Sequence, residues 1–227
     1  SASFESSDEG AVLRELYSGD TINIVPGRAY AIVNGLDDDL IRKEAEKAEK
    51  ETGVSFSISA TAEGLRIDAE GQGAHAAHPD DGKNAALALL HLVNLLPLGD
   101  CAQTRLLKEL EKLFPYGDNY GRAFGIAVED ELSGPTTASA DILRADREHI
   151  ELHVDSRTAV AANEENTVKP AVNNAEKAGF TLEYTLGAPH VVDGDTDFVK
   201  TLLRCYEDVK GVEGHLMSIG GGTYAHD

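Results

Sequence analysis

Two histidines in a glycine-rich segment are the residues whose chemistry is easiest to interpret from the sequence. Residues 71–86 read G-Q-G-A-H-A-A-H-P-D-D-G-K-N-A-A, which places His75 and His78 between a short alternating strand and a long apolar helix. Glycine and proline at this density favour a loop. An imidazole on such a loop can donate a hydrogen bond to an oxyanion, which makes His75 a candidate catalytic residue. The alternative is a surface histidine that is hydrogen-bonded to the backbone.

A metal site is the second chemistry that these residue types could provide. His75, His78 and Asp81 could bind a metal ion, but their spacing does not place them on one face of a helix. His153 and Asp155 form an H-x-D pair whose side chains would share one face of a strand. A solvated strand face explains that pair more simply, so we predict no metal ligand in this chain.

Three further segments resemble binding motifs in part. Residues 193–197 begin like a calcium-binding loop, but Phe198 stands where that loop needs glycine and Arg204 where it needs glutamate. Residues 220–222 are three glycines, too few for a nucleotide-binding fingerprint but enough to let a ligand approach the backbone. Arg157 ends a predicted strand, and within a cleft its guanidinium would bind a carboxylate through two hydrogen bonds.

The composition is that of a folded protein with an acidic surface. The 227 residues are 41% hydrophobic and 26% charged, with 40 acidic and 20 basic side chains and a formal net charge of −20. Such a surface repels phosphate groups, so we expect no nucleic-acid partner. The longest apolar run, residues 85–98, is too short to cross a bilayer, and we expect no membrane partner. Cys101 and Cys205 indicate neither a disulfide framework nor a zinc finger, and a cytoplasmic enzyme fits this pattern.

The elements that must position these residues alternate between strands and helices. Residues 1–11 are expected to be a loose lead-in, and a first helix is expected between Asp37 as N-cap and Gly53 as its C-terminal stop. Alternating apolar residues predict strands at residues 12–17, 29–34, 54–59, 65–69, 136–143, 148–157, 180–186 and 215–219. Helical spacing predicts further helices at residues 84–96, 104–114, 166–177 and 198–209.

One pattern occurs twice along the chain. The triplet A-E-K at residues 48–50 precedes Gly53 and an alternating strand, and A-E-K at residues 175–177 precedes Gly179 and a second such strand. Two β-α-β units predict an α+β protein of two related halves, each an antiparallel sheet with helices on one face. A match as short as this one can also arise by chance.

Four separated motifs together resemble the M20 family of zinc peptidases, and most closely its monomeric dipeptidases of the PepV and Xaa-His type. The motifs are N-I-V-P at residues 23–26, the His75 loop, D-S-R at residues 155–157, and G-G-G-T-Y-A at residues 220–225. They occur in the order of the family and extend over nearly the whole chain.

The resemblance implies a fold and a division of the chain. Residues 1–100 and 101–190 would be two ferredoxin-like halves of a doubled lid domain, and residues 191–227 would be the incomplete returning segment of the catalytic domain. In such enzymes two zinc ions generate a hydroxide, and a glutamate transfers its proton. The resemblance therefore implies Zn²⁺ as cofactor and a dipeptide or short peptide as substrate.

The resemblance also assigns roles to residues of this chain. His75 would stabilise the tetrahedral oxyanion, and Arg157, helped by Asn23, would bind the C-terminal carboxylate of the peptide. Substrate-binding positions in the glycine-rich turn would line the cleft from the side of the catalytic domain: Gly221, Gly222 and Thr223.

The family's metal ligands do not match positions in this sequence. Its H-x-D motif, bridging aspartate, Glu-Glu pair and final histidine would lie before Ser1 and after Asp227. We therefore predict that the isolated chain does not hydrolyse peptides, and that the rest of the parent catalytic domain is its partner. The segment 198–219 is then expected either to pack irregularly on the lid or to pair with another copy.

Two alternatives to a dipeptidase lid remain. One is another M20 amide hydrolase, such as a deacylase or a desuccinylase. The other is a non-catalytic ligand-binding or dimerisation module that uses Arg157 to bind a carboxylate.

Overall fold

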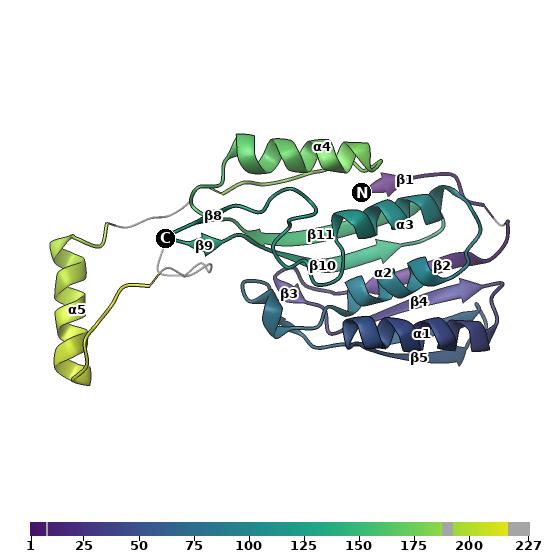
Figure 1. Cartoon of the computed structure of the whole chain (residues 1–227), viewed down its shortest axis with the longest axis horizontal. Coiled ribbons are helices and arrows are strands. Elements are labelled where there is room, and N and C mark those ends of the chain that lie inside the picture. Colours follow the sequence, from purple (N-terminus) through teal and green to yellow (C-terminus); the bar gives the residue numbers. More distant parts are fainter. Residues whose placement is uncertain (8, 188–192, 218–227) are drawn as a thin grey trace.

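The computed structural model describes residues 1–7, 9–187 and 193–217, and its centre is one antiparallel sheet. The seven strands lie in the order β1-β11-β10-β2-β4-β6-β5, and every pairing between them is antiparallel (Figure 1). Their bounds are β1 (Ala2–Ser3), β2 (Val12–Ser18), β4 (Arg28–Asn34), β5 (Ser55–Ala60), β6 (Leu65–Glu70), β10 (Thr137–Ala145) and β11 (His149–Arg157). The predicted α+β class is confirmed.

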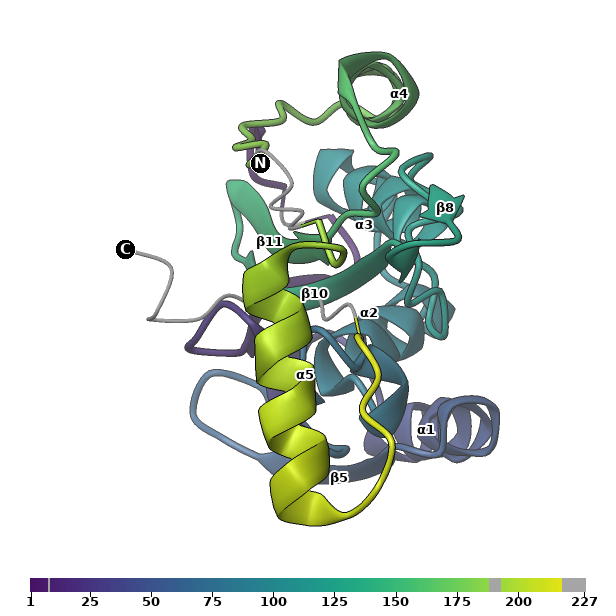
Figure 2. The same cartoon turned by 90° about the vertical axis from the view of Figure 1, so that its left-hand side faces the viewer.

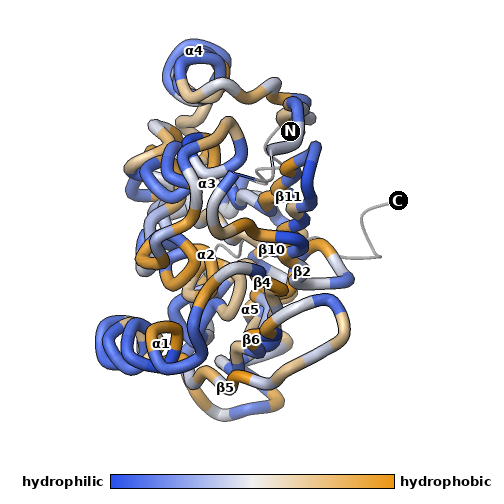
Figure 3. Tube along the Cα trace, turned by 90° about the vertical axis from the view of Figure 1, so that its right-hand side faces the viewer, coloured by the Kyte–Doolittle hydropathy of each residue, from blue (hydrophilic) through white to orange (hydrophobic). Residues whose placement is uncertain are grey.

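Three helices cover one face of this sheet. They are α1 (Asp38–Thr52), α2 (Ala85–Leu95) and α3 (Ala102–Leu113), and Figures 2 and 3 show all three on the same side of the strands. The central helix α2 contacts α1, α3 and strands β2, β4, β6 and β10. Because α2 is enclosed in this way, its sequence is apolar on nearly every side and shows no polar stripe.

The ends of α1 and α2 have the residues that helix capping requires. The Asp37 side chain accepts the Asp39 N–H at 2.9 Å, and Gly53 ends α1 in the left-handed conformation with φ of 67°. The Asn84 side chain accepts the Leu87 N–H at 3.1 Å and donates to the Ala140 carbonyl at 2.8 Å. Asn84 therefore both begins α2 and ties it to β10.

The first and last strands of the predicted pattern differ from expectation. Residues 180–186 form no strand, and Ala2–Ser3, predicted as part of a loose lead-in, forms β1 and pairs with β11. Ser1 and Thr181 exchange two backbone hydrogen bonds of 2.8 Å. Residues 180–186 therefore meet the sheet beside β1, whose two residues offer too short an edge for a seven-residue strand.

The two predicted halves contribute to the same sheet. Strands β1, β2, β4, β5 and β6 come from residues 1–100, and β10 and β11 come from residues 101–190. The domain boundaries at residues 100 and 190 stay predictions. Two short ribbons lie outside the sheet, β3 (Ile24–Val25) with β7 (Ala74–His75), and β8 (Glu129–Asp130) with β9 (Gly134–Pro135).

The C-terminal helices lie at the margins of the structure. A π-helical turn (Glu164–Val168) leads into α4 (Lys169–Lys177), and α5 (Asp197–Lys210) lies beyond the separate β8–β9 ribbon, at that end of the main sheet (Figure 1). No residue of α5 is buried, and Phe198 is 72% exposed. Residues 215–217 form no strand, and the rest of the strand expected at 215–219 lies outside the described residues. Within the described ranges, no helix is long and apolar enough to span a membrane.

His91 connects the three helices through two carboxylates. Its Nδ1 lies 2.6 Å from Glu111 of α3, and its Nε2 lies 2.7 Å from Glu51 of α1. Burial alone would lower the pKa of His91, but the hydrogen bonds to Glu111 and Glu51 outweigh burial and raise it. A neutral imidazole has one N–H and can donate to only one of the two carboxylates.

We expect His91→Gln to remove a pH-dependent part of the stability. Because the folded pKa is raised, the contribution is complete below the unfolded value of 6.5 and is lost as the pH rises through the folded value. Urea unfolding should show that the wild-type advantage over His91→Gln falls by about 1.5 kcal/mol between low and high pH. His149→Gln is the control, since the His149 ring contacts the Ser3 hydroxyl and, among the described residues, no carboxylate. A wild-type advantage that is constant with pH would contradict the prediction.

Candidate functional site

The β3–β7 ribbon brings Asn23 and His75 together, although 52 positions separate them in the sequence. Ile24 pairs with His75, and the Ala76 N–H donates to the Asn23 carbonyl at 2.9 Å. Asn23 is half-buried and has a positive φ of 77°, the left-handed region that asparagine tolerates better than most residues. The ribbon therefore presents both predicted residues from adjacent backbone segments.

The ring of His75 is oriented by its own loop. The Ala77 N–H donates to Nδ1 of His75 at 3.0 Å. In the neutral ring the proton must then reside on Nε2, because a nitrogen that accepts a hydrogen bond carries no hydrogen. His75 is exposed, so the ring can present an Nε2–H donor to a group outside the loop.

Asp80 anchors the rest of the histidine loop. Its carboxylate accepts hydrogen bonds from the Asn119 side chain at 2.7 Å and from the Tyr120 hydroxyl. These two contacts, that of Asn119 first, lower the pKa of Asp80 and keep it ionised. Asp80 belongs to a short 3₁₀ turn (Pro79–Asp81) that precedes α2. The loop is therefore fixed by the β3–β7 ribbon at its start and by the Asp80 contacts near its end.

Arg157 lies at the same end of the sheet as the ribbon. It is the last residue of β11 and pairs with Thr137 at the start of β10, and the Thr137 hydroxyl donates to the Ala76 carbonyl at 3.4 Å. Nε and Nη2 of Arg157 donate to the two oxygens of Asp155 at 2.8 and 2.7 Å. This forked contact orients the guanidinium, whose side chain is 29% exposed.

Asp141 is the member of this cluster that the sequence analysis missed. Its side chain is fully buried, and its carboxylate accepts the Asn23 N–H at 2.7 Å and the Ser139 hydroxyl. Burial is the largest of several influences and raises the pKa of Asp141 to about 6. The available signal was a single aspartate within a run of small and apolar strand residues, A-S-A-D-I-L.

The histidines and carboxylates weighed as metal ligands have other partners or lie apart. Nε2 of His153 lies 3.0 Å from Glu151, and Asp155 holds Arg157. In the part of the chain that the structure describes, no group of three or more histidine, cysteine, aspartate or glutamate residues could hold a metal ion. These residues do not fit a zinc pair. The predicted substrate-binding positions Gly221, Gly222 and Thr223 lie outside the described residues.

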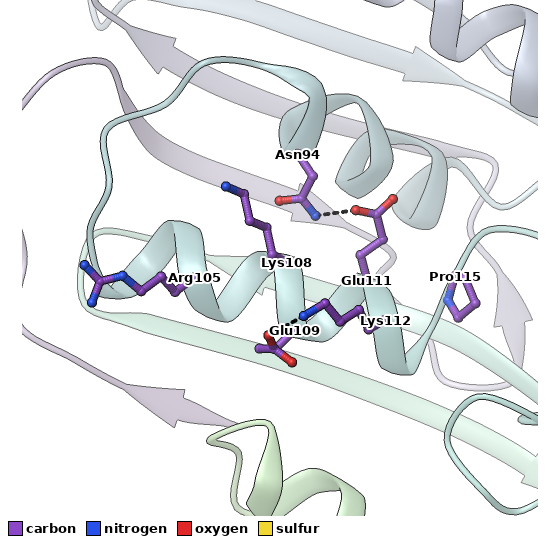
Figure 4. Close-up of a pocket in the computed structure, with 7 residues that line it drawn as sticks. All are labelled: Asn94, Arg105, Lys108, Glu109, Glu111, Lys112 and Pro115. Carbon is purple, nitrogen blue, oxygen red and sulfur yellow. Dashed lines mark hydrogen bonds and ion pairs between the residues drawn. The ribbon is translucent and has the colours of Figure 1, made fainter.

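Two hollows of the surface lie away from this cluster. One, of about 680 Å³, lies between the end of α2 and the outer side of α3, where Lys108 and Lys112 stand beside Glu109 and Glu111 (Figure 4). The other, of about 310 Å³, lies over β4, β5 and β6. Neither is lined by His75, Asn23 or Arg157.

Comparison with known proteins shows what the chain is similar to. No protein-family model matches the chain. It is 31% identical, over 95% of its length, to "Putative dipeptidase YtjP" of Bacillus subtilis (strain 168), and 31% identical, over 94% of its length, to "Beta-Ala-Xaa dipeptidase" of Lactobacillus delbrueckii subsp. lactis. The chain is similar to bacterial dipeptidases. It spans 46% and 45% of the lengths of these two relatives, which is less than half of each.

Proposed function

We propose that this chain is the substrate-binding lid of an M20-type zinc dipeptidase that acts on short peptides. Three observations support the proposal: the similarity to dipeptidases over nearly the whole chain, the junction of the His75 and Asn23 segments, and the adjacency of that junction to Arg157. The observation that carries it is the hydrogen bond from Ala77 to Nδ1 of His75. That bond leaves an outward-facing donor of the kind that amide hydrolysis needs.

His75 would act on the charge that develops during peptide cleavage. Attack on an amide carbonyl turns its oxygen into an oxyanion, and a donor oriented in advance stabilises that charge more than it stabilises the ground state. The Ala77 contact sets the ring orientation before substrate arrives. His75 therefore contributes to the transition state and little to the affinity for substrate.

Arg157 would recognise the free carboxyl end of the peptide. A guanidinium has five N–H donors in a planar fork that suits carboxylate geometry. Asp155 accepts hydrogen bonds from two of them and so fixes the orientation of the guanidinium. Asn23, on the neighbouring ribbon, would help to bind the same carboxylate.

The zinc ions and their ligands belong to the rest of the parent protein in this proposal. The described residues do not fit a zinc pair, and their part in the reaction is to bind the peptide and to stabilise the oxyanion. The partner of the chain is then the remainder of a catalytic domain, in a cytoplasmic enzyme.

Comparison of the isolated chain with the full-length parent protein tests this function. Both would be assayed for dipeptide hydrolysis with added zinc, cobalt or manganese, and bound metal would be counted in the same samples. We expect turnover and stoichiometric metal in the parent only. N-acyl amino acids in the same assay would identify a deacylase instead. Turnover by the isolated chain would contradict the assignment of the metal ligands to the flanking parts, and an inactive parent would contradict the dipeptidase assignment.

A further inference from the structure

Strand β10 contains an irregularity at the point where it meets the candidate site. Against β11, Ala140 pairs with Val154 and Ile142 pairs with His153, so Asp141 is an extra residue in a β-bulge. Residues 138–141 are all buried, so the bulge lies in a fully enclosed part of the strand. The pairing register of the strand shifts by one residue at Asp141. Bulges commonly redirect a side chain next to a functional site.

The segment after β2 lies close against this bulge. Pairing of β2 with β10 stops at Ser18 and Leu143, and Gly19 follows with φ of 69°. A Cβ at Gly19 would lie 1.8 Å from the Asp141 carbonyl oxygen, so only glycine allows this approach. The chain then reaches Asn23, and the β3 ribbon contacts β10 there.

Both carboxylate oxygens of Asp141 are used at this contact. Oδ2 accepts the Asn23 N–H at 2.7 Å, and Oδ1 accepts the Ser139 hydroxyl. Asn23 is the one non-glycine residue with positive φ in the described parts of the chain. Its carbonyl in turn accepts the Ala76 N–H at 2.9 Å, and Ala76 follows His75 directly.

We propose that Asp141 is a positioning residue that holds Asn23 in its left-handed conformation and thereby sets the place of the His75 ribbon relative to Arg157. The hydrogen bonds run from β10 through Asn23 to the residue next to His75, while Ser139 pairs across the sheet with Asp155, which orients Arg157. Asp141 thus lies between the two groups that the proposed function assigns to oxyanion and carboxylate. The effect of Asp141 on catalysis rests on the proposed function, whereas the hydrogen bonds from Asp141 through Asn23 to Ala76 can be tested without it.

The protonation state of Asp141 provides a direct observable. The charged groups that act on it are Asp155 and Arg157 of β11, while Asn23 and Ser139, its hydrogen-bonding partners, do not titrate. In the wild-type chain the Asn23 amide resonance is expected to titrate with a midpoint of about 6. Ser139→Ala should move the midpoint upward, because the Ser139 hydroxyl lowers the pKa of Asp141. An Asn23 titration that persists unchanged in Asp141→Asn would overturn the proposal, because another group would then act on the Asn23 amide.

Asp141→Asn tests the connection to the histidine ribbon in the same chain. We expect the Asn23 titration to disappear and hydrogen exchange of the Ala76 amide to accelerate by about tenfold or more, with the Tyr17 amide of β2 unchanged. Asp146→Asn is the matched control, since Asp146 also accepts backbone N–H groups but lies at the far turn of the same hairpin. An Ala76 amide that exchanges equally fast in wild type and Asp141→Asn would overturn the proposal.

A double-mutant cycle in the full-length parent separates positioning from general stability. Asp141→Asn should lower kcat by about tenfold in the wild-type background and should have little further effect in a His75→Ala background. If Asp141→Asn lowers kcat by the same factor in both backgrounds, Asp141 does not act through His75, and the proposal is overturned. A parent without dipeptidase activity would instead refute the proposed function and leave the Asn23 and Ala76 results valid.

Discussion

His75→Ala in the full-length parent is expected to lower kcat for dipeptide hydrolysis by about 10²- to 10³-fold, with a small change in KM. The reason is that, in the proposed function, the Nε2–H of His75 would interact with charge that exists only in the transition state, since the Ala77 N–H leaves Nε2 as the donor of the ring. Steady-state kinetics over a range of substrate concentrations measure both constants.

His78→Ala is the matched control for this experiment. His78 is exposed, lies three residues away in the same loop, and begins the 3₁₀ turn without a side-chain cap bond. Its removal should leave kcat nearly unchanged. If both alanine variants lose activity equally, the activity depends on the loop as a whole and not on the imidazole of His75. That result would contradict the role of His75 in stabilising the oxyanion. Amide spectra of the isolated chain verify that both variants keep the fold.

Arg157→Lys should mainly change substrate affinity. A lysine keeps the positive charge but loses the planar fork, so KM for dipeptides with a free C-terminal carboxylate is expected to rise by about 10- to 100-fold. The same dipeptides with an amidated C-terminus should be hydrolysed by both proteins with similar KM. The comparison of acid and amide substrates therefore measures recognition of the carboxylate directly.

Arg66→Lys provides the control, because Arg66 also forms a forked contact with an aspartate two residues away. Its Nε donates to Asp68 at 2.9 and 3.1 Å on strand β6, and its guanidinium lies 3.8 Å from the centre of the Tyr30 ring. This contact lies on β6, which is separated from β11 in the sheet by β10, β2 and β4, and its loss should leave KM unchanged. A similar rise in KM for acid and amide substrates in Arg157→Lys would refute carboxylate recognition.

Much of the architecture could be predicted because it depends on neighbouring residues. The Asp37 cap, the Gly53 stop and the turn between β10 and β11 at Asp146 all use interactions within a few positions of the chain. The helix α2 and the strands around it were also predicted, since their apolar patterns are long. The strand expected at residues 180–186 was wrong, because a strand needs a partner edge and local patterning contains no information about whether one is available; this segment meets the sheet at Thr181, which is hydrogen-bonded to Ser1.

The candidate site shows the same division. The sequence by itself determined which residue types are present in the motifs that contain Asn23, His75 and Arg157, and in what order, and it placed His75 in a loop. Only the tertiary structure decided that the three motifs meet at one end of the sheet and that Asp141 is buried beneath Asn23. The contact between Ala77 and the imidazole is local, but the sequence pattern does not show that it forms. A one-residue bulge and a hydrogen bond across 118 positions place Asp141 beneath Asn23, and neither leaves a periodic pattern in the sequence.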